Sequence, residues 1–258
     1  MKKLTLIGLL VFSVITLSAC DLMQEYFEIE PTAQTTQLDD RSMQEMMMAT
    51  RTHIRATNLG VQVDLFNVVA GRFERMAGTS RGSGVIFAYE EGYYYALTNF
   101  HVIDPQDYAR ATYTVISSHL DASFEAEVVF WDEAKDLAIL KFAAPEVVLP
   151  LMDVTTRETI PLTTDEFVLA VGNPSALTSL VTFGEFIRLA RVSDVDFPVL
   201  LHSALIFPGN SGGALTDLEG HLVGINTWTS RNDDERNLAV PLTEVLAFIR
   251  AYDETLIP

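Results

Sequence analysis

The sequence predicts an all-β protein, and two observations on the residues from about 60 onward support this class. First, β-branched and aromatic residues form short apolar runs separated by clusters of Gly, Asn, Asp and Pro, a pattern typical of a β-sandwich or β-barrel. Second, the roughly 200 residues of this part suffice for two consecutive barrels of about six strands each, at about 12 to 16 residues per strand and turn. The clearest runs lie at 61–66, 84–89, 93–98, 126–130, 137–142, 167–171 and 222–227. One helix is expected in this part, at residues 241–251.

The composition excludes several other classes. Of the 258 residues, 35 are acidic and 17 are basic, so the formal net charge is −18, and 48% of the residues are hydrophobic. A charge of this sign repels phosphate, and nucleic-acid binding is therefore not expected. The apolar content is too high for a disordered chain. Because the chain has one cysteine, an internal disulfide, a paired-cysteine redox site and a multi-cysteine metal site are excluded. We expect neither a metal nor a cofactor.

The N-terminus has the features of a secretory signal. Lys2 and Lys3 precede an apolar run at residues 4–17, which is too short for a stable membrane span. The segment at 17–20, Leu-Ser-Ala-Cys, resembles the bacterial lipobox, whose cysteine is diacylated. We therefore predict a lipoprotein signal peptide at 1–19 and lipidation of Cys20. This places the protein at the extracytoplasmic face of a bacterial membrane, lipid-anchored. The alternative is a soluble secreted protein in which Cys20 is not lipidated.

Residues 20–58 predict a tether that ends in a possible short helix. The stretch through Asp40 is polar, and Ser42 with Glu45 three residues later fits a capping box that opens a helix. The methionines at 46–48 could indicate a metal or partner site. Packing of all three on one helix face is the interpretation we prefer.

Three local motifs contain residue types suited to chemistry. Residues 208–215 place Ser211 in a glycine-rich turn that runs into an apolar strand. Glycines beside a nucleophile let backbone N–H groups face a developing oxyanion, although a tight hairpin turn would have the same composition. His101 follows the aromatic run at 93–98, and Asp136 begins the apolar run at 137–142. Taken singly, each of these two would be a structural or turn residue.

Taken together, the order His101, Asp136, Ser211 is the order of the chymotrypsin-type triad. At this point the sequence resembles a family, the trypsin-like serine proteases of the bacterial HtrA/DegP type. The resemblance covers roughly residues 60–250. The motifs that carry it are Gly-Ser-Gly-Val-Ile at 82–86, Thr-Asn-Phe-His-Val-Ile at 98–103, Lys-Asp-Leu-Ala-Ile-Leu at 135–140, Val-Gly-Asn-Pro at 171–174, and the segments 209–215, 220–226 and 237–241.

The resemblance implies a protease domain at 59–258 with the chymotrypsin or trypsin-like fold, two six-stranded β-barrels with the active site between them and a short C-terminal helix. It implies that His101 is the general base, that Asp136 orients it and that Ser211 is the nucleophile. It also implies an oxyanion hole at Gly209, Asn210 and Ser211, with the N–H groups of Gly209 and Ser211 as donors.

The specificity pocket implied by the resemblance has no acidic residue. Its walls would come from Leu205, Ile206, Asn226, Thr227 and Trp228. Because a pocket for Lys or Arg needs a negative charge, small or medium apolar substrate side chains are expected instead.

Several positions depart from the family pattern. Ser203 stands where HtrA-type enzymes usually carry Asp, and Phe207 stands where Asn is common. Asn210, just before the nucleophile, has no charge to pair with a new N-terminus, so activation by zymogen cleavage is not expected. No C-terminal PDZ domain is expected after the final helix. His202 and His221 are expected to have packing or turn roles.

The function predicted from the sequence is that of a membrane-anchored serine endopeptidase that acts on unfolded or extracytoplasmic proteins. Its expected partners are a protein or peptide substrate and, through the lipid anchor, a membrane. Two alternatives remain. A catalytically silent relative could use the same cleft as a binding module, or a lipoprotein adaptor could use its acidic surface. The sequence does not determine the oligomeric state.

Overall fold

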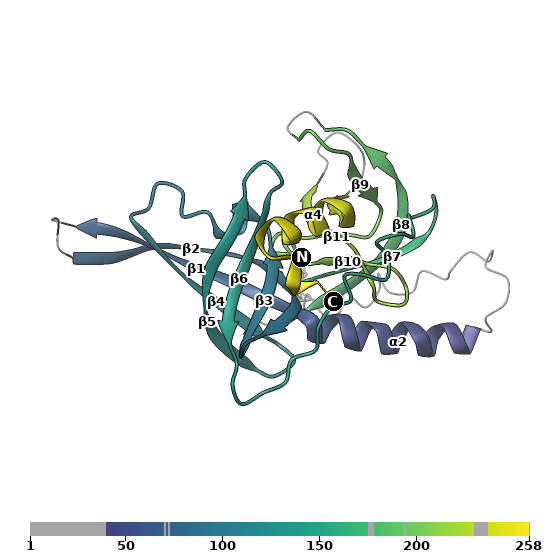
Figure 1. Ribbon diagram of the computed structural model, residues 1–258, viewed down its shortest axis with the longest axis horizontal. Coiled ribbons are helices and arrows are strands. Elements are labelled where there is room, and N and C mark those ends of the chain that lie inside the picture. The colour runs from purple at the N-terminus through teal and green to yellow at the C-terminus, as the bar shows by residue number, and fades with distance from the viewer. Residues whose placement is uncertain are drawn as a thin grey trace, which may run out of the picture. The chain divides into compact units, whose positions relative to one another are not determined.

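The computed structural model describes residues 40–257, except 70, 72, 175–177, 193–194 and 230–236, and it describes side chains from residue 45 onward. The predicted signal peptide at 1–19, Cys20 and the tether up to residue 39 lie outside the described residues. The described part contains two closed, six-stranded antiparallel barrels and a C-terminal helix (Figure 1). The predicted all-β class with two barrels is therefore confirmed.

Barrel 1 is formed by the first six strands, in the spatial order β1-β2-β3-β6-β5-β4, and β1 pairs with β4 to close it. Every second residue of β1 from Leu59 to Leu65 is buried in the barrel interior, because side chains alternate across a strand. The bounds are β1 (Asn58–Val69), β2 (Phe73–Glu90), β3 (Tyr93–Thr98), β4 (Arg110–Ser117), β5 (Ala122–Asp132) and β6 (Leu137–Ala143).

Barrel 2 is formed by the last six strands, in the spatial order β10-β11-β12-β9-β8-β7. Leu200 of β9 and Leu215 of β10 belong to its inner cluster, whereas Leu201 packs in a separate cluster with Trp228. Of the twelve strands described, β4, β8, β9, β10 and β12 fall outside the runs named from the sequence, although β10 and β12 overlap motifs that carried the resemblance. The bounds are β7 (Phe167–Gly172), β8 (Leu180–Ala190), β9 (Val199–His202), β10 (Ala214–Thr216), β11 (Leu222–Thr229) and β12 (Asn237–Pro241).

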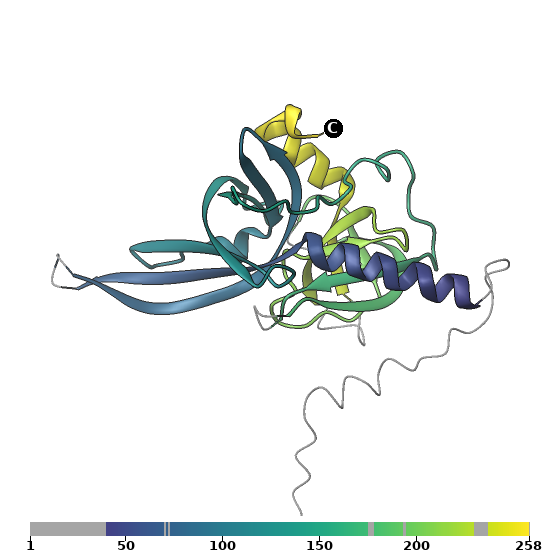
Figure 2. The ribbon, with the colours of Figure 1, turned by 90° about the horizontal axis from the view of Figure 1, so that it is seen from below.

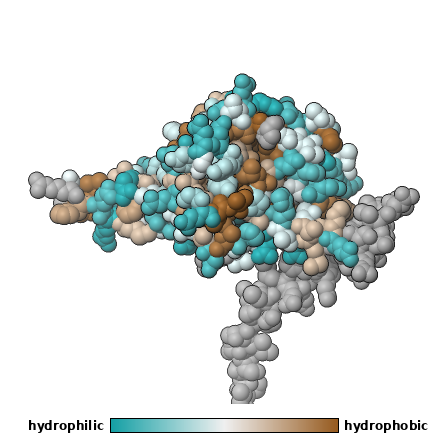
Figure 3. Space-filling model, turned by 60° about the horizontal axis from the view of Figure 1, so that its bottom comes forward, coloured by the Kyte–Doolittle hydropathy of each residue, from teal (hydrophilic) through white to brown (hydrophobic). Residues whose placement is uncertain are grey.

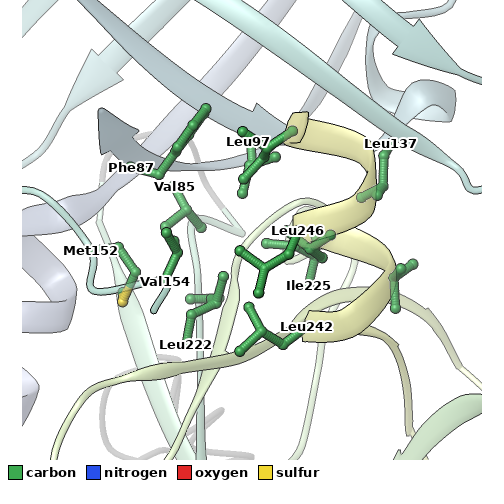
Figure 4. Packing of buried hydrophobic residues seen from close by; sticks show 14 of the residues in the cluster. Val85, Phe87, Leu97, Leu137, Met152, Val154, Leu222, Ile225, Leu242 and Leu246 are labelled. Atoms are coloured by element: carbon green, nitrogen blue, oxygen red, sulfur yellow. The ribbon is translucent and has the colours of Figure 1, made fainter. Parts of the chain in front are cut away.

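A shared apolar core joins the two barrels. It combines side chains of β2 and β3, the segment that connects the barrels, β11 and the helix α4 (Leu242–Tyr252), which confirms the helix predicted at 241–251 (Figure 4). Phe248 of α4 stacks on Phe130 of β5, with 5.0 Å between the ring centroids. A single 3-10 turn, η1 (Glu254–Leu256), follows. Because this core belongs to both barrels, residues that face each other across the barrel boundary keep a fixed separation.

The helix α2 (Asp40–Thr57) precedes the barrels and is longer than the short helix predicted. It begins two residues before Ser42, which was expected to cap it. Thr50 and Ile54, one turn apart, are buried, and the helix contacts β1, β2 and β8. The expectation for the methionines is wrong for Met48, which is 69% exposed, because consecutive helical residues point about 100° apart. Within the described residues, no helix is long and apolar enough to cross a membrane.

The paired strands β1 and β2 project beyond barrel 1 as a two-stranded arm (Figures 1 and 2). Their pairing continues to Val69 and Phe73, whereas β4 accompanies β1 only as far as Phe66. Apolar residues are exposed along the arm (Figure 3), and Phe73 is 70% exposed. An isolated two-stranded ribbon is only marginally stable, so contacts at the base of this arm are expected to stabilise it. There Arg110 lies over the ring of Phe66, 4.4 Å from its centroid, and donates hydrogen bonds to Glu74.

Candidate active site

His101 lies just after β3, on the one-turn helix α3 (Phe100–Ile103). Val102 and Ile103, which follow it, are buried in the core of barrel 1. This anchoring directs the preceding residue outward, and 44% of the His101 side chain is exposed. A substrate can therefore reach the imidazole.

Asp136 lies in the turn between β5 and β6 and is 6% exposed. Its φ is +52°, in the left-handed region that Asp tolerates better than most residues. Two hydrogen bonds hold this backbone. The Asp136 N–H donates to the Glu133 carbonyl at 3.2 Å, and the Asn99 side-chain amide donates to the Asp136 carbonyl at 2.8 Å. Asn99 thus connects the turn to the segment that carries His101.

The His101 ring and the Asp136 carboxylate form a close pair. His101 Nδ1 lies 2.8 Å from one carboxylate oxygen and 3.0 Å from the other, and the His101 backbone N–H donates to the carboxylate at 2.9 Å. A carboxylate accepts and does not donate, so this contact places the ring proton on Nδ1. Nε2 then keeps its lone pair and can act as a base. The Thr227 hydroxyl also donates to this carboxylate, at 2.5 Å.

Ser211 follows a tight turn at residues 207–210. The Asn210 N–H donates to the Phe207 carbonyl at 2.9 Å, Pro208 occupies the second position of the turn, and Gly209 has φ +99° at the third. These features define a type II turn, in which proline fixes one φ and glycine adopts a positive φ without a steric penalty. The turn immediately precedes Ser211.

Glycines near Ser211 allow close backbone packing between the barrels. A Cβ on Gly213 would lie 2.0 Å from the Val171 carbonyl oxygen at the end of β7, and a Cβ on Gly212 would lie 2.2 Å from the Ser83 carbonyl oxygen on β2. Both distances are far below van der Waals contact. The Ser211 segment is therefore held between β7 and β2, and no larger residue fits at either position.

The Ser211 hydroxyl donates to the Thr227 carbonyl at 3.2 Å, and among the described residues no hydrogen bond joins it to His101. Thr227 thus contacts Ser211 through its carbonyl and Asp136 through its hydroxyl. Within the described part, the N–H groups of Gly209 and Ser211 have no acceptor, whereas the Asn210 N–H is used in the turn. Two neighbouring backbone donors therefore remain available beside the Ser211 hydroxyl.

The residues named for the specificity pocket occupy different places. Leu205 and Ile206 are half-buried in the loop after β9, and Ile206 packs on the inner cluster of barrel 2. The fully buried Asn226 donates to the carbonyls of Gly213 and Ala214, so it supports the strand that follows Ser211. Trp228 packs in a different cluster from Ile206.

His202 and His221 have the packing and turn roles expected of them. His202 is fully buried in barrel 2, and burial lowers its pKa to about 4, so it is neutral. His221 lies 3.0 Å from Asp217 across a tight turn. Ser203 is exposed and accepts a hydrogen bond from the Glu185 N–H at 2.9 Å.

Sequence reasoning did not identify the roles of Ser83, Asn99 and the Thr227 hydroxyl. The first two lie within motifs that carried the resemblance, and Thr227 was named only as a wall of the specificity pocket. The available signal was a polar residue beside apolar residues in each of these segments.

Comparisons with known proteins agree with this geometry. Residues 82–225 match the trypsin-like peptidase domain family. The "putative serine protease HhoA" of Synechocystis is 31% identical over 185 residues, which cover 69% of this chain and 44% of that protein. The "periplasmic serine endoprotease DegP" of Escherichia coli K12 is 33% identical over 149 residues, which cover 57% of this chain and 29% of DegP. This chain thus spans less than half the length of these curated relatives.

Solved structures extend the likeness to the fold. A serine endoprotease from Yersinia pestis aligns with a TM-score of 0.61 and 29% identity, over 80% of this chain and 66% of that one. The HtrA-type protease AlgW, solved with a tripeptide, aligns with a TM-score of 0.65 and 27% identity, over 81% of this chain and 64% of that one. The chain therefore belongs to the trypsin-like peptidase domain family, and it is homologous to proteases of the HtrA/DegP type.

Proposed function

We propose that this chain is a serine endopeptidase in which Ser211, His101 and Asp136 form the catalytic triad. One observation carries the proposal: Thr227 accepts a hydrogen bond from Ser211 and donates one to Asp136, which is itself paired with His101. The nucleophile of barrel 2 and the His-Asp pair of barrel 1 therefore share a neighbour. A serine hydroxyl is a weak nucleophile until an imidazole takes its proton, and these residues supply both groups.

In the proposed reaction, Ser211 Oγ attacks the carbonyl carbon of the scissile peptide bond while His101 Nε2 takes the hydroxyl proton. The Asp136 carboxylate stabilises the resulting imidazolium through Nδ1–H. His101 then gives the proton to the leaving amine, the C–N bond breaks and an acyl-enzyme remains. Water, deprotonated by His101, then attacks the ester carbonyl carbon, and His101 returns the proton to Ser211 Oγ as the C–O bond breaks and the acid is released. The first step requires the Ser211 hydroxyl to rotate from the Thr227 carbonyl toward His101, and such contacts often tighten only when substrate binds.

The Gly209 and Ser211 N–H groups are the proposed oxyanion hole. They lie on either side of the Asn210 N–H, which is already bonded, and they have no acceptor among the described residues. Donors that are fixed before the reaction stabilise the negative oxygen of the tetrahedral intermediate without reorganisation.

For substrate specificity, we propose a preference for small or medium apolar side chains. The support is the apolar character of Leu205, Ile206 and Trp228, together with the absence of an acid among the five residues named for the pocket. By analogy with relatives named as periplasmic proteases, unfolded extracytoplasmic proteins are the proposed substrates.

The catalytic assignment is tested with Ser211→Ala and a fluorophosphonate probe, which reacts with activated serines. The wild type should hydrolyse an unfolded protein and become labelled, and the variant should do neither while keeping its thermal unfolding temperature. The resting contact between Ser211 and Thr227 also fits a second candidate function, a catalytically silent binding module. A wild-type protein that is neither labelled nor active would favour that module.

We further propose that Cys20 is lipidated and anchors the protein to the extracytoplasmic face of a bacterial membrane. The support is the lipobox-like segment at 17–20. More than one acyl chain makes such anchoring stable. Wild-type protein should partition into the detergent phase of a detergent extraction, and Cys20→Ser should move it to the aqueous phase. Wild-type protein found in the aqueous phase would contradict the anchor and leave the catalytic proposal intact.

A further inference from the structure

Ser83, on β2 of barrel 1, makes four hydrogen bonds and is completely buried. Its hydroxyl donates to the Gly209 carbonyl at 2.6 Å and accepts from the Asn173 N–H at 2.7 Å. Its N–H donates to the Ser211 carbonyl at 2.8 Å, and its carbonyl accepts from the Thr98 hydroxyl at 2.7 Å. Ser83 therefore contacts Gly209 and Ser211, the two residues on either side of Asn210.

We propose that Ser83 is a positioning residue that holds the two oxyanion-hole N–H groups in their productive direction. This inference rests on the proposed function. Ser83 does not touch the substrate; it acts through the backbone of residues 209–212.

The planarity of the peptide unit explains how this works. The Gly209 carbonyl and the Asn210 N–H belong to one rigid plane, which Ser83 holds at the carbonyl and Phe207 holds at the N–H. The Ser211 carbonyl and the Gly212 N–H form a second plane, held by Ser83 and by the Asn226 carbonyl. The plane between them carries the Ser211 N–H. Because both of its neighbours are fixed at two ends, that plane has little freedom to turn.

The hydroxyl matters because Gly209 does not hold itself in place. With φ at +99° and no side chain, Gly209 can adopt several backbone conformations, some of which would turn its N–H away from the hole. The Asn173 N–H occupies an acceptor site of Ser83 Oγ, and the Ser83 proton is directed to the Gly209 carbonyl. Removing the hydroxyl would leave a buried donor and a buried acceptor without this partner.

Ser83 also connects the two halves of the proposed triad. It lies on β2, which pairs with β3, the strand that precedes His101. The residues it contacts at 173, 209 and 211 belong to barrel 2. The same side chain therefore positions the segment 209–211 against β2 and β3, the strand pair that precedes His101.

The test compares Ser83→Ala with Thr50→Val, a matched control. The Thr50 hydroxyl also makes a largely buried hydrogen bond to a carbonyl, that of Leu218 at 2.8 Å, but it lies on α2 and contacts none of the proposed site residues. For Ser83→Ala we expect kcat for a peptide substrate to fall about tenfold to a hundredfold, less than the 10²- to 10³-fold loss typical when an oxyanion donor itself is removed. The KM should change less than about threefold. Thr50→Val should keep kcat.

A peptide boronate, which forms a tetrahedral adduct with the active serine, separates positioning from general destabilisation. Its affinity should fall by the same factor as kcat in Ser83→Ala, whereas the affinity of a non-reactive peptide inhibitor should not change. Ser83→Thr, which keeps the hydroxyl, should restore most of the boronate affinity. If Ser83→Ala does not fold, Ser83→Cys replaces it in the test. A thiol fills the space of the hydroxyl but is a weak hydrogen-bond donor, so kcat and boronate affinity should fall only in part.

The inference is overturned if kcat and boronate affinity of Ser83→Ala, or of Ser83→Cys where alanine does not fold, stay within about twofold of wild type. It is also overturned if Thr50→Val, at an equal loss of thermal stability, loses as much kcat as Ser83→Ala, because the loss would then come from destabilisation alone. An inactive, unlabelled wild type would instead overturn the proposed function and this inference with it.

Discussion

Barrel 1 and barrel 2 hold their contributions to the site by different means. In barrel 1, hydrogen bonds fix the pair, since the Asp136 carboxylate accepts from the backbone and the ring of His101. In barrel 2, close backbone packing fixes Ser211, since Gly212 and Gly213 press against carbonyls of β2 and β7. One half of the site thus depends on the chemical identity of side chains, and the other depends on the absence of side chains.

This difference predicts different weaknesses. An exchange that keeps size but changes a donor or an acceptor should damage barrel 1, whereas one added methyl group should damage barrel 2. Thr227 belongs to barrel 2 but donates a hydrogen bond to the Asp136 carboxylate of barrel 1, so substitutions of Thr227 test both kinds of support.

The largest effect is expected for Asp136→Asn, which keeps shape and removes the charge. The amide can donate to His101 Nδ1 and so stabilise the tautomer whose Nε2 carries the proton and cannot act as a base. We expect kcat to fall by about 10⁴, the magnitude known for this exchange in another Ser-His-Asp triad, with an unchanged fold. Steady-state kinetics and circular dichroism check this. Asp132→Asn at the end of β5 is the control, because Asp132 accepts from the Lys135 N–H and does not contact His101. Equal activity of Asp136→Asn and wild type would exclude this His-Asp pair from catalysis.

A smaller loss is expected from Gly213→Ala in barrel 2. The added Cβ would lie 2.0 Å from the Val171 carbonyl oxygen, so the backbone beside Ser211 must move by about 1 Å to restore contact distance. A misplacement of that size costs about 10²-fold in kcat. The control is Gly78→Ala on β2, whose added Cβ would lie in ordinary contact, 3.8 Å from the Tyr108 hydroxyl oxygen. If both alanine variants retain full activity, close packing does not position Ser211.

Thr227→Val should cost less, about tenfold in kcat. Valine keeps the β-branched shape and the carbonyl that accepts from Ser211 but removes the hydroxyl donor to Asp136. A hydrogen bond to a charged group contributes about 1.5 to 3 kcal/mol, of which only part is felt in the transition state. Thr227→Ser, which keeps the donor, should remain close to wild type in the same kinetic assay. Equal losses in the valine and serine variants would instead indicate a packing role for the threonine methyl group.

The fold was predictable where local pattern dominates. The strand predicted at 93–98 matches β3 at both ends, because a Glu-Gly turn precedes it and Asn99 ends it. In contrast, β8 was not named, since it contains Gly184, Glu185 and Arg188 among its apolar residues. Glycine is needed at position 184 because a Cβ there would lie 2.0 Å from the Ala204 backbone nitrogen. That close approach depends on a distant segment, which local sequence does not reveal.

The proposed triad was predictable from the order and spacing of motifs, whereas its supports were not. The contact between Thr227 and Asp136 joins residues 91 positions apart, and that between Ser83 and Gly209 joins residues 126 positions apart. Each crosses from one barrel to the other. The positive φ of Asp136 could not be predicted from the sequence either, because hydrogen bonds with Glu133 and Asn99 stabilise it. Supports of this kind follow from how the barrels dock.

The smallest expected effect concerns pH and barrel 2, where His202 is buried and burial lowers its pKa from 6.5 to about 4. The unfolded chain takes up a proton near pH 6.5, but the folded chain does so only near pH 4, so stability is complete above pH 6.5 and is lost as pH falls toward 4. Between pH 7 and 5.5 this amounts to about 1 kcal/mol. Urea unfolding at both pH values should show that His202→Leu loses less stability on acidification than wild type. As a control, His119→Gln, at an exposed position, should lose as much stability between the two pH values as the wild type. If wild type and His202→Leu lose the same stability between the two pH values, acid sensitivity does not arise from the buried imidazole of barrel 2.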